Sequence, residues 1–314
     1  MGRAAPMESQ AQSYGTGEIS EAPVHPLRAV AGLIWAVHRR VLVTRTAHVL
    51  PYSGLGALFV REHWTPGRWV LLLLCATFAR ATAVGLSRAL GTPADVSNPI
   101  PEPGKLPRSA PPPRGVWVAF ALHGAAIFVF LAFMLNLRSG WGAVAVLALL
   151  LVQSVARPYS GLSHLALGSA LGAATLAGWV AFSDRFPPLN HGIWMLAAGA
   201  TLWATGFDIL YSLRASAREG SGVGHYQGPM ALPLVQVIRV GRFIQVGAVL
   251  LFTAGVVMQD LGPISYLGAI VATVLLMASH HGLPRDGFHP ASLRFMACQL
   301  AIGPVLFLGV LLSG

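Results

Sequence analysis

An acidic residue stands near the end of one long apolar run of this sequence. The run "WMLAAGATLWAT" leads into "GFDILYSLRASAREG", which carries Asp208 and Tyr211 and then three further charged residues: Arg214, Arg218 and Glu219. An acid inside a membrane-spanning helix is costly unless it is paired, and such residues commonly mark functional sites. Asp208 is therefore the first candidate for chemistry in this chain.

The composition indicates that the helix carrying this acid lies in a membrane. The chain of 314 residues is 54% hydrophobic and only 10% charged, whereas about a quarter of the residues of a typical soluble domain are charged. The two cysteines, Cys75 and Cys298, both lie in apolar runs and are interpreted as small buried hydrophobic residues. The sequence therefore predicts an all-α integral membrane protein.

Apolar runs long enough to cross a bilayer, about 17–25 residues, recur along the chain. Residues 1–25 are polar and lack an apolar core, so they do not resemble a signal peptide, and residues 1–40 are predicted to form a disordered cytoplasmic tail. Residues 41–314 form the predicted membrane domain. Its nine predicted spans lie near residues 42–60, 69–90, 115–136, 141–156, 163–182, 192–213, 233–257, 262–281 and 293–312.

The basic residues predict the orientation of these spans. Most of them fall in the N-terminal tail or beside the loops after the second, fourth, sixth and eighth spans. The other side carries only Arg61, Arg68, Arg138 and Arg185. By the positive-inside rule, the N-terminus lies in the cytoplasm and the protein lies in the cytoplasmic membrane. This bias also accounts for most of the net charge of +10, so nothing supports a nucleic-acid partner.

Five stretches resemble, in order, landmarks of the UbiA family of intramembrane prenyltransferases. "TGFDILYSL" resembles the "AGFDTIYA" signature of its 4-hydroxybenzoate and related quinone-biosynthesis branch. "RTAHVLPYSGLGALF", "ARATAVGLSRALGTPADVSNP" and "RPYSGLSHLALGSALG" resemble "HTVFALPFALIGA", "ARSAAMAFNRIIDRDIDAKNP" and "KRFTHLPQLVLGLAFG", and "FHPASLRFMACQLAIGPVLFLG" resembles the family's last helix. The resemblance covers residues 40–314 and implies nine transmembrane helices around a central cavity.

The resemblance also implies a reaction, the transfer of a prenyl group from a prenyl diphosphate to an aromatic quinone precursor. In the family, two aspartate motifs hold Mg²⁺, which suits oxygen ligands and bridges carboxylates to phosphates. This chain departs from both motifs. Where the family has Asn or Asp, it carries Ser87, Gly91, Ala215 and Arg218, and it keeps Asp95 and Glu219 as candidate ligands of a weakened Mg²⁺ site.

The remaining candidate roles also follow from the resemblance. Asp208 and Tyr211 are the candidate catalytic residues, which would position the aromatic acceptor. Basic side chains would bind the diphosphate directly, because guanidinium groups pair with phosphate through two hydrogen bonds. The candidates for this binding are Arg88, Lys105, Arg157, Arg214 and Arg218.

Two alternatives to an altered prenyltransferase remain open on the sequence. The first is a non-catalytic UbiA-like protein that binds a polyprenyl lipid or quinone, or that scaffolds a partner. The second is an unrelated transporter with Arg80, His123 and His164 along its pathway, although both histidines are more simply interpreted as buried core residues. Trp203 and Phe207, four residues apart, either line a prenyl tunnel or only pack together.

Overall fold

The computed structural model describes residues 49–90, 113–156, 161–218, 233–281 and 293–313. Contacts within the chain divide it into two units, Met1–Arg39 and Arg40–Gly314, and every described residue belongs to the second unit. The predicted tail, residues 1–40, therefore lies outside the described residues.

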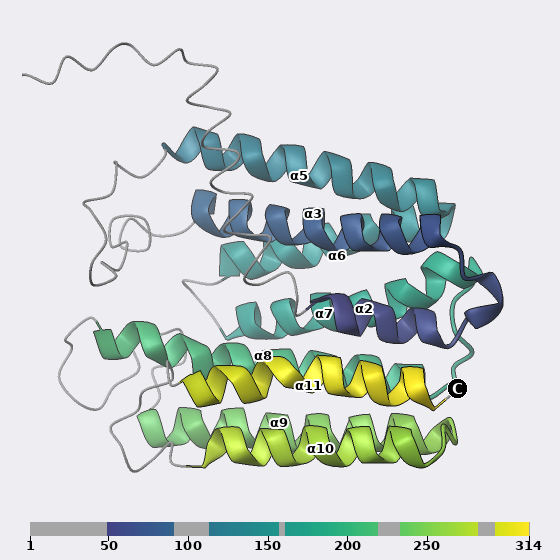
Figure 1. Cartoon of the computed structure of the whole chain (residues 1–314). Helices are drawn as coiled ribbons and strands as arrows, with labels where there is room; N and C mark the ends of the chain where they lie inside the picture. The colour runs from purple at the N-terminus through teal and green to yellow at the C-terminus, as the bar shows by residue number, and fades with distance from the viewer. Residues whose placement is uncertain (1–48, 91–112, 157–160, 219–232, 282–292, 314) are drawn as a thin grey trace, which may run out of the picture. The chain divides into compact units, whose positions relative to one another are not determined.

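Nine α-helices make up the described part of the chain (Figure 1). Eight of them are long and apolar enough to cross a membrane, as the sequence predicted. The helices are α2 (Val49–Leu58), α3 (Pro66–Leu90), α5 (Arg114–Leu135), α6 (Leu137–Ala156), α7 (Leu162–Ser183), α8 (Ile193–Arg218), α9 (Leu234–Met258), α10 (Pro263–His280) and α11 (Leu293–Leu312), with a short 3₁₀ turn, η2 (Arg61–His63), after α2.

Two helix boundaries differ from those expected. The first predicted span, 42–60, is represented by the ten-residue helix α2, and its earlier residues lie outside the described part. Helix α8 continues to Arg218, five residues beyond the predicted end of the sixth span. The prediction that Arg214 and Arg218 belong to a loop was therefore wrong. The segment Arg-Ala-Ser-Ala-Arg consists mainly of good helix formers, which lets the helix extend past its apolar part.

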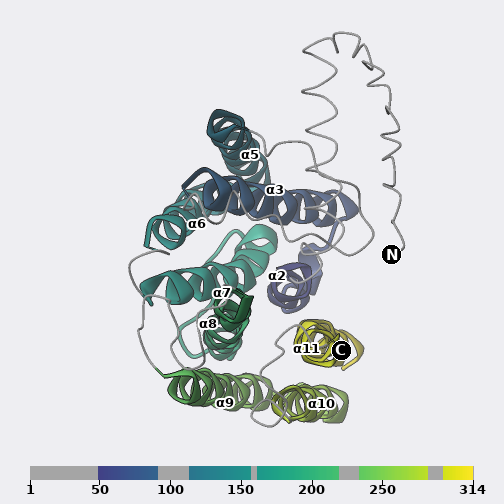
Figure 2. The same cartoon turned by 90° about the vertical axis from the view of Figure 1, so that its left-hand side faces the viewer.

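Six helices form a closed ring in which each helix packs against the next (Figure 2). The order around the ring is α2, α7, α8, α9, α10 and α11, and α11 packs again on α2. Helices α3, α5 and α6 pack together outside this ring, with α6 against α7. Helices α3, α6, α8 and α10 end on the same side of the bundle, at the left of Figure 1, which is the side predicted to be cytoplasmic.

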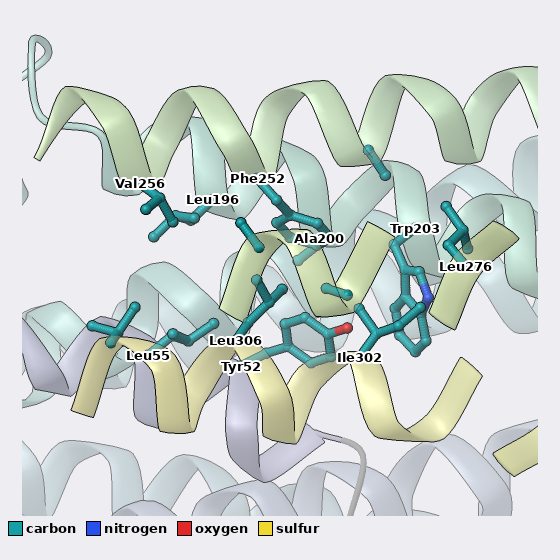
Figure 3. Packing of buried hydrophobic residues seen from close by; sticks show 14 of the residues in the cluster. Tyr52, Leu55, Leu196, Ala200, Trp203, Phe252, Val256, Leu276, Ile302 and Leu306 are labelled. Carbon is teal, nitrogen blue, oxygen red and sulfur yellow. The ribbon is translucent and has the colours of Figure 1, made fainter. Parts of the chain in front are cut away.

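Aromatic and aliphatic side chains fill most of the ring's interior (Figure 3). Tyr52 of α2 stacks on Trp203 of α8 and Phe252 of α9, with ring centroids 5.2 and 6.4 Å away. A small cavity of about 10 Å³, roughly the room that one water molecule needs, remains among α8, α9, α10 and α11. Its lining is apolar apart from one threonine and the Trp203 indole nitrogen, and contains no acidic residue: Trp203, Ala248, Val249, Phe252, Ala269, Ala272, Thr273, Leu276 and Ile302.

A hydrogen-bonded network of buried polar side chains joins the four helices around this cavity. Gln299 of α11 accepts a bond from the Trp203 indole at 2.8 Å and donates to Ser279 of α10 at 3.0 Å. Gln245 of α9 exchanges bonds with Gln299 at 3.1 and 3.2 Å, and its Oε1 lies 2.7 Å from His280 Nε2. Both glutamine side chains are fully buried, so these bonds compensate for the loss of water.

The opposite side of the bundle is held by side chains that donate hydrogen bonds to the last carbonyl groups of helices. Arg68 donates to Phe182 O at 2.7 Å, and Arg138 donates to Asp184 O and pairs with the Asp184 carboxylate. Arg61 donates to Val310 O in the last turn of α11. Helix carbonyls at a C-terminus lack intrahelical partners and carry partial negative charge. This capping explains why arginines occur on the side that has few basic residues.

Replacing Asn136 with Ala is expected to lower the free energy of unfolding by about 1–2 kcal/mol. Asn136 Oδ1 accepts a bond from the Ser139 backbone N–H at 2.7 Å, and its amide donates to Val180 O at 2.8 Å. The substitution removes both bonds, one at the start of α6 and one at the end of α7. Thermal unfolding in detergent checks this result against Asn190→Ala, a change at an exposed turn residue. Equal stability of the two variants would contradict it.

Candidate functional site

Asp208 lies on α8, almost three turns before the helix ends, and is paired with a histidine of the neighbouring helix. Its Oδ2 lies 2.7 Å from Nδ1 of His164, near the start of α7. Because a carboxylate oxygen accepts hydrogen bonds, Nδ1 carries the proton and donates it. The His164 side chain is 6% exposed and that of Asp208 is 29% exposed. The acid is therefore held on its buried side and accessible on the other.

Small residues bring α7 and α8 close enough for this pair to form. After His164, Gly168 and Gly172 follow at intervals of one turn on the same face of α7. A Cβ atom on Gly168 would lie 2.1 Å from Thr205 Oγ1, and one on Gly172 would lie 2.1 Å from Thr201 Oγ1. These glycines allow the two backbones to approach closely, as is usual where membrane helices pack. The short side chain of the acid can then reach the imidazole.

A series of stacked aromatic rings runs along α8 from the cavity to the level of the acid. Trp203, Phe207 and Tyr211 follow at four-residue intervals, and both neighbouring pairs have ring centroids 5.7 Å apart. Phe295 of α11 stacks against Phe207 at 6.1 Å. Trp203 and Phe207 therefore pack together, and Trp203 also lines the cavity. Tyr211 ends this row of rings, and Asp208, about one turn before it, lies on the neighbouring face of α8, which packs against α7.

The other predicted site residues are placed only in part. Arg88 lies in the last turn of α3, where its guanidinium is 6.0 Å from the centroid of the Trp117 ring of α5. This interaction is a cation–π contact. Arg214 and Arg218 belong to α8, but the positions of their side chains are not described. The roles of four further residues stay predictions, because these residues lie outside the described ranges: Asp95, Lys105, Arg157 and Glu219.

The described residues alone do not form a Mg²⁺ site. Within the described ranges, no group of three or more His, Cys, Asp or Glu side chains is placed to hold a metal ion. At α8 these ranges supply one carboxylate, Asp208, and one imidazole, His164. Mg²⁺ takes an octahedral set of oxygen ligands and seldom uses imidazole. A Mg²⁺ site in this chain would need carboxylates from outside the described ranges, and Asp95 and Glu219 stay the predicted ligands.

His123 and His164, which were both predicted to be buried core residues, have different environments. His123 is exposed on α5, so that interpretation was wrong for it. His164 is buried, as expected, but its bond to Asp208 was not predicted. The spacing of residue types within α7 and within α8 could have indicated this contact. One face of α7 carries a histidine and two glycines one turn apart, and one face of α8 carries two threonines and the acid.

Known proteins resemble this chain in overall structure more than in sequence. The sequence matches no protein-family profile. It has no significant similarity to a curated protein. A UbiA homolog from Aeropyrum pernix K1 superposes with a TM-score of 0.69 at 24% identity, over 87% of this chain and 98% of that one. A structure of digeranylgeranylglyceryl phosphate synthase gives a TM-score of 0.61 at 13% identity, over 89% and 98%.

A third similar structure contains ligands. The UbiA homolog from Archaeoglobus fulgidus bound to DMAPP and Mg²⁺ superposes with a TM-score of 0.54 at 14% identity, over 90% of this chain and 98% of that one. The same homolog has also been solved with Cd²⁺. These structural similarities, together with the eight membrane-length helices, show that the chain is a multi-pass membrane protein with the fold of the UbiA homologs.

Proposed function

We propose that this chain is a UbiA-like membrane prenyltransferase that joins a prenyl group to an aromatic quinone precursor. The observation that carries the proposal is Asp208, an accessible acid held by His164 and one turn from Tyr211, where a row of stacked aromatic rings that begins at an apolar cavity ends. The fold supports it, since a UbiA homolog of this fold has been solved with DMAPP and Mg²⁺. The "GFDILY" stretch supports the aromatic acceptor through its resemblance to the quinone-biosynthesis branch.

The two ends of a prenyl diphosphate suit the two ends of this path. The isoprenoid chain is apolar and would lie against Phe207 and Trp203, toward the cavity. The diphosphate would lie near the ends of α3 and α8, which are on the same side of the bundle. Positive charge there would bind it, because guanidinium and ammonium groups pair strongly with phosphate oxygens. The proposed ligands are Arg88, Lys105, Arg157, Arg214 and Arg218.

The proposed reaction is a substitution on the acceptor ring. The bond between the prenyl carbon and the diphosphate oxygen breaks, and the diphosphate leaves with the electron pair. A carbon of the aromatic ring supplies the electron pair of the new C–C bond and then loses its proton. We assign Asp208 to orient the acceptor hydroxyl and to accept this proton. The Tyr211 hydroxyl would hold the other edge of the acceptor.

Mg²⁺ and the orientation in the membrane belong to the same proposal. When bound, Mg²⁺ would be held by Asp95 and Glu219 and would neutralise charge on the diphosphate. The loss of the other carboxylates predicts weaker metal binding than in a complete pair of motifs. The site would face the cytoplasm, with the N-terminus on that side of the cytoplasmic membrane, as the distribution of basic residues supports.

One observation favours a non-catalytic alternative. At positions where the family motifs have acidic residues that hold two cations, this chain carries Gly91, Ala215 and Arg218. The positive charge of a guanidinium group at such a position repels Mg²⁺. Such a protein would keep the fold and bind a polyprenyl lipid or quinone. The transporter alternative has less support, because His123 is exposed on α5 while His164 is buried against Asp208.

Product formation by the full chain in lipid vesicles separates these functions. The protein would be supplied with Mg²⁺, prenyl diphosphates of increasing length and 4-hydroxybenzoate, and the products analysed by mass spectrometry. We expect a prenylated acceptor and released diphosphate, with turnover reduced at least about tenfold by EDTA, Asp95→Ala or Glu219→Ala. Turnover of both variants at the wild-type rate would remove these two residues from the mechanism. The absence of product with every substrate would favour the non-catalytic alternative.

A further inference from the structure

We propose that His164 is the positioning residue for Asp208: it holds one carboxylate oxygen so that the other oxygen faces the acceptor. This assignment rests on the proposed function and adds to it a residue from outside the two aspartate motifs. It starts from the 2.7 Å bond between His164 Nδ1 and Asp208 Oδ2. His164 would not touch the substrate and would act only through the carboxylate.

The burial of the two partners shows which of them is available for chemistry. The imidazole is buried in the contact between α7 and α8, whereas the carboxylate is 29% exposed. One oxygen of Asp208 is committed to His164, which fixes the rotation of the carboxylate group. The charge-assisted bond is short and directional, so it restricts the side chain more than contact with apolar neighbours would. Oδ1 remains for a second hydrogen bond, on the accessible side.

The second nitrogen of His164 supports a neutral ring. Among the described residues, Nε2 is buried and has no hydrogen-bond partner. If Nε2 carried a proton, a charged N–H group would be buried without an acceptor, which is more costly than a lone pair without a donor. The geometry therefore favours the tautomer with the proton on Nδ1. The pair then carries one negative charge, located on Asp208, as a proton acceptor requires.

The glycines of α7 make the position of the imidazole a fixed one. The α7 backbone at Gly168 and Gly172 lies so close to Thr205 and Thr201 of α8 that even a Cβ atom at either glycine would clash with the threonine side chain. His164 lies one turn before Gly168 on that face. The contact between the helices therefore sets the place of Nδ1 relative to Asp208. A side chain with a donor at that place should replace histidine, and a side chain without one should not.

Two substitutions test the positioning role with matched shapes. His164→Asn places an amide N–H donor near the position of Nδ1, and His164→Leu keeps similar bulk without a donor. We expect the Leu variant to lower kcat about 10- to 100-fold, with KM for the prenyl diphosphate changed less than about threefold. The Asn variant should stay within about fivefold of wild type. His123→Leu, at an exposed site on α5, is the control for a histidine-to-leucine change in a membrane helix.

A double-mutant cycle provides a readout that needs no turnover. The melting temperatures of His164→Leu, Asp208→Ala and the double variant should be non-additive, because each single change removes the bond between the two side chains. Additive melting temperatures would overturn the pairing. Equal kcat of wild type and His164→Leu, or equal loss in the Asn and Leu variants, would overturn the positioning role. Absence of turnover in the wild type would instead refute the proposed function, and with it this assignment.

Discussion

Asp208→Asn is expected to lower the rate of prenyl transfer by about 100-fold or more while the protein stays folded. Asparagine has nearly the same shape, and its carbonyl oxygen can accept the bond that His164 Nδ1 now donates to Oδ2 at 2.7 Å. The change removes the negative charge and with it the group that would accept the acceptor's proton. The measurement is the initial rate of product formation in vesicles, normalised to folded protein.

Asp184→Asn is the matched control for this loss of charge. Asp184 lies at the opposite end of the bundle, where its carboxylate is 3.1 Å from Arg138. Its backbone φ of 52° is left-handed, a conformation that asparagine tolerates. We expect this variant to turn over at the wild-type rate. If Asp208→Asn also retained the wild-type rate, Asp208 would have no catalytic role.

Gly178→Ala is expected to destabilise the membrane domain by about 3 kcal/mol or more. A Cβ atom at Gly178 of α7 would lie 1.8 Å from the Ser53 carbonyl oxygen of α2 and 3.0 Å from the Ala57 nitrogen. Both of these atoms belong to the α2 backbone, so the two helices must move apart. Helix α2 carries Tyr52, which stacks on Trp203 in the ring's interior. The same change should therefore disturb the aromatic path.

Gly142→Ala provides the comparison for the Gly178 variant. A Cβ atom at Gly142 of α6 would meet no atom within 4 Å, and alanine favours helix over glycine by about 1 kcal/mol. Thermal unfolding in detergent should show this variant to be as stable as wild type or more stable. If Gly178→Ala were equally stable, the close contact between α2 and α7 would be wrong.

The sequence predicted the membrane helices well because length and apolar character alone determine whether a segment can cross a bilayer. Eight predicted spans correspond to helices of membrane length. The boundary of α8 could not be predicted in the same way. The segment from Arg214 to Arg218 is too polar to count as part of a membrane span, but its helix-forming residues can continue a helix that has already formed. Hydropathy predicts where the apolar, membrane-spanning part of a helix ends, but the helix itself can continue beyond that point.

The partner of the acid was less accessible to sequence reasoning. "GFDILY" singled out Asp208 and Tyr211 by type and position, but His164 is 44 residues away from the acid. Their bond depends on two glycines that let α7 approach α8, and a tertiary approach of this kind is not encoded in either helix alone. Asp95, Lys105, Arg157 and Glu219 remain predictions from the sequence, because they lie outside the described residues.

Photoaffinity labelling tests most directly whether prenyl transfer takes place at the Asp208 end of α8. The full chain in vesicles would be irradiated with a prenyl diphosphate analogue that carries a photoreactive group on its first isoprene unit, and the labelled peptides would be mapped by mass spectrometry. We predict labelling of α8 around Phe207 and Tyr211, prevented by excess unlabelled prenyl diphosphate. Labelling confined to the exposed outer faces of the helices, and unchanged by the competitor, would contradict this location.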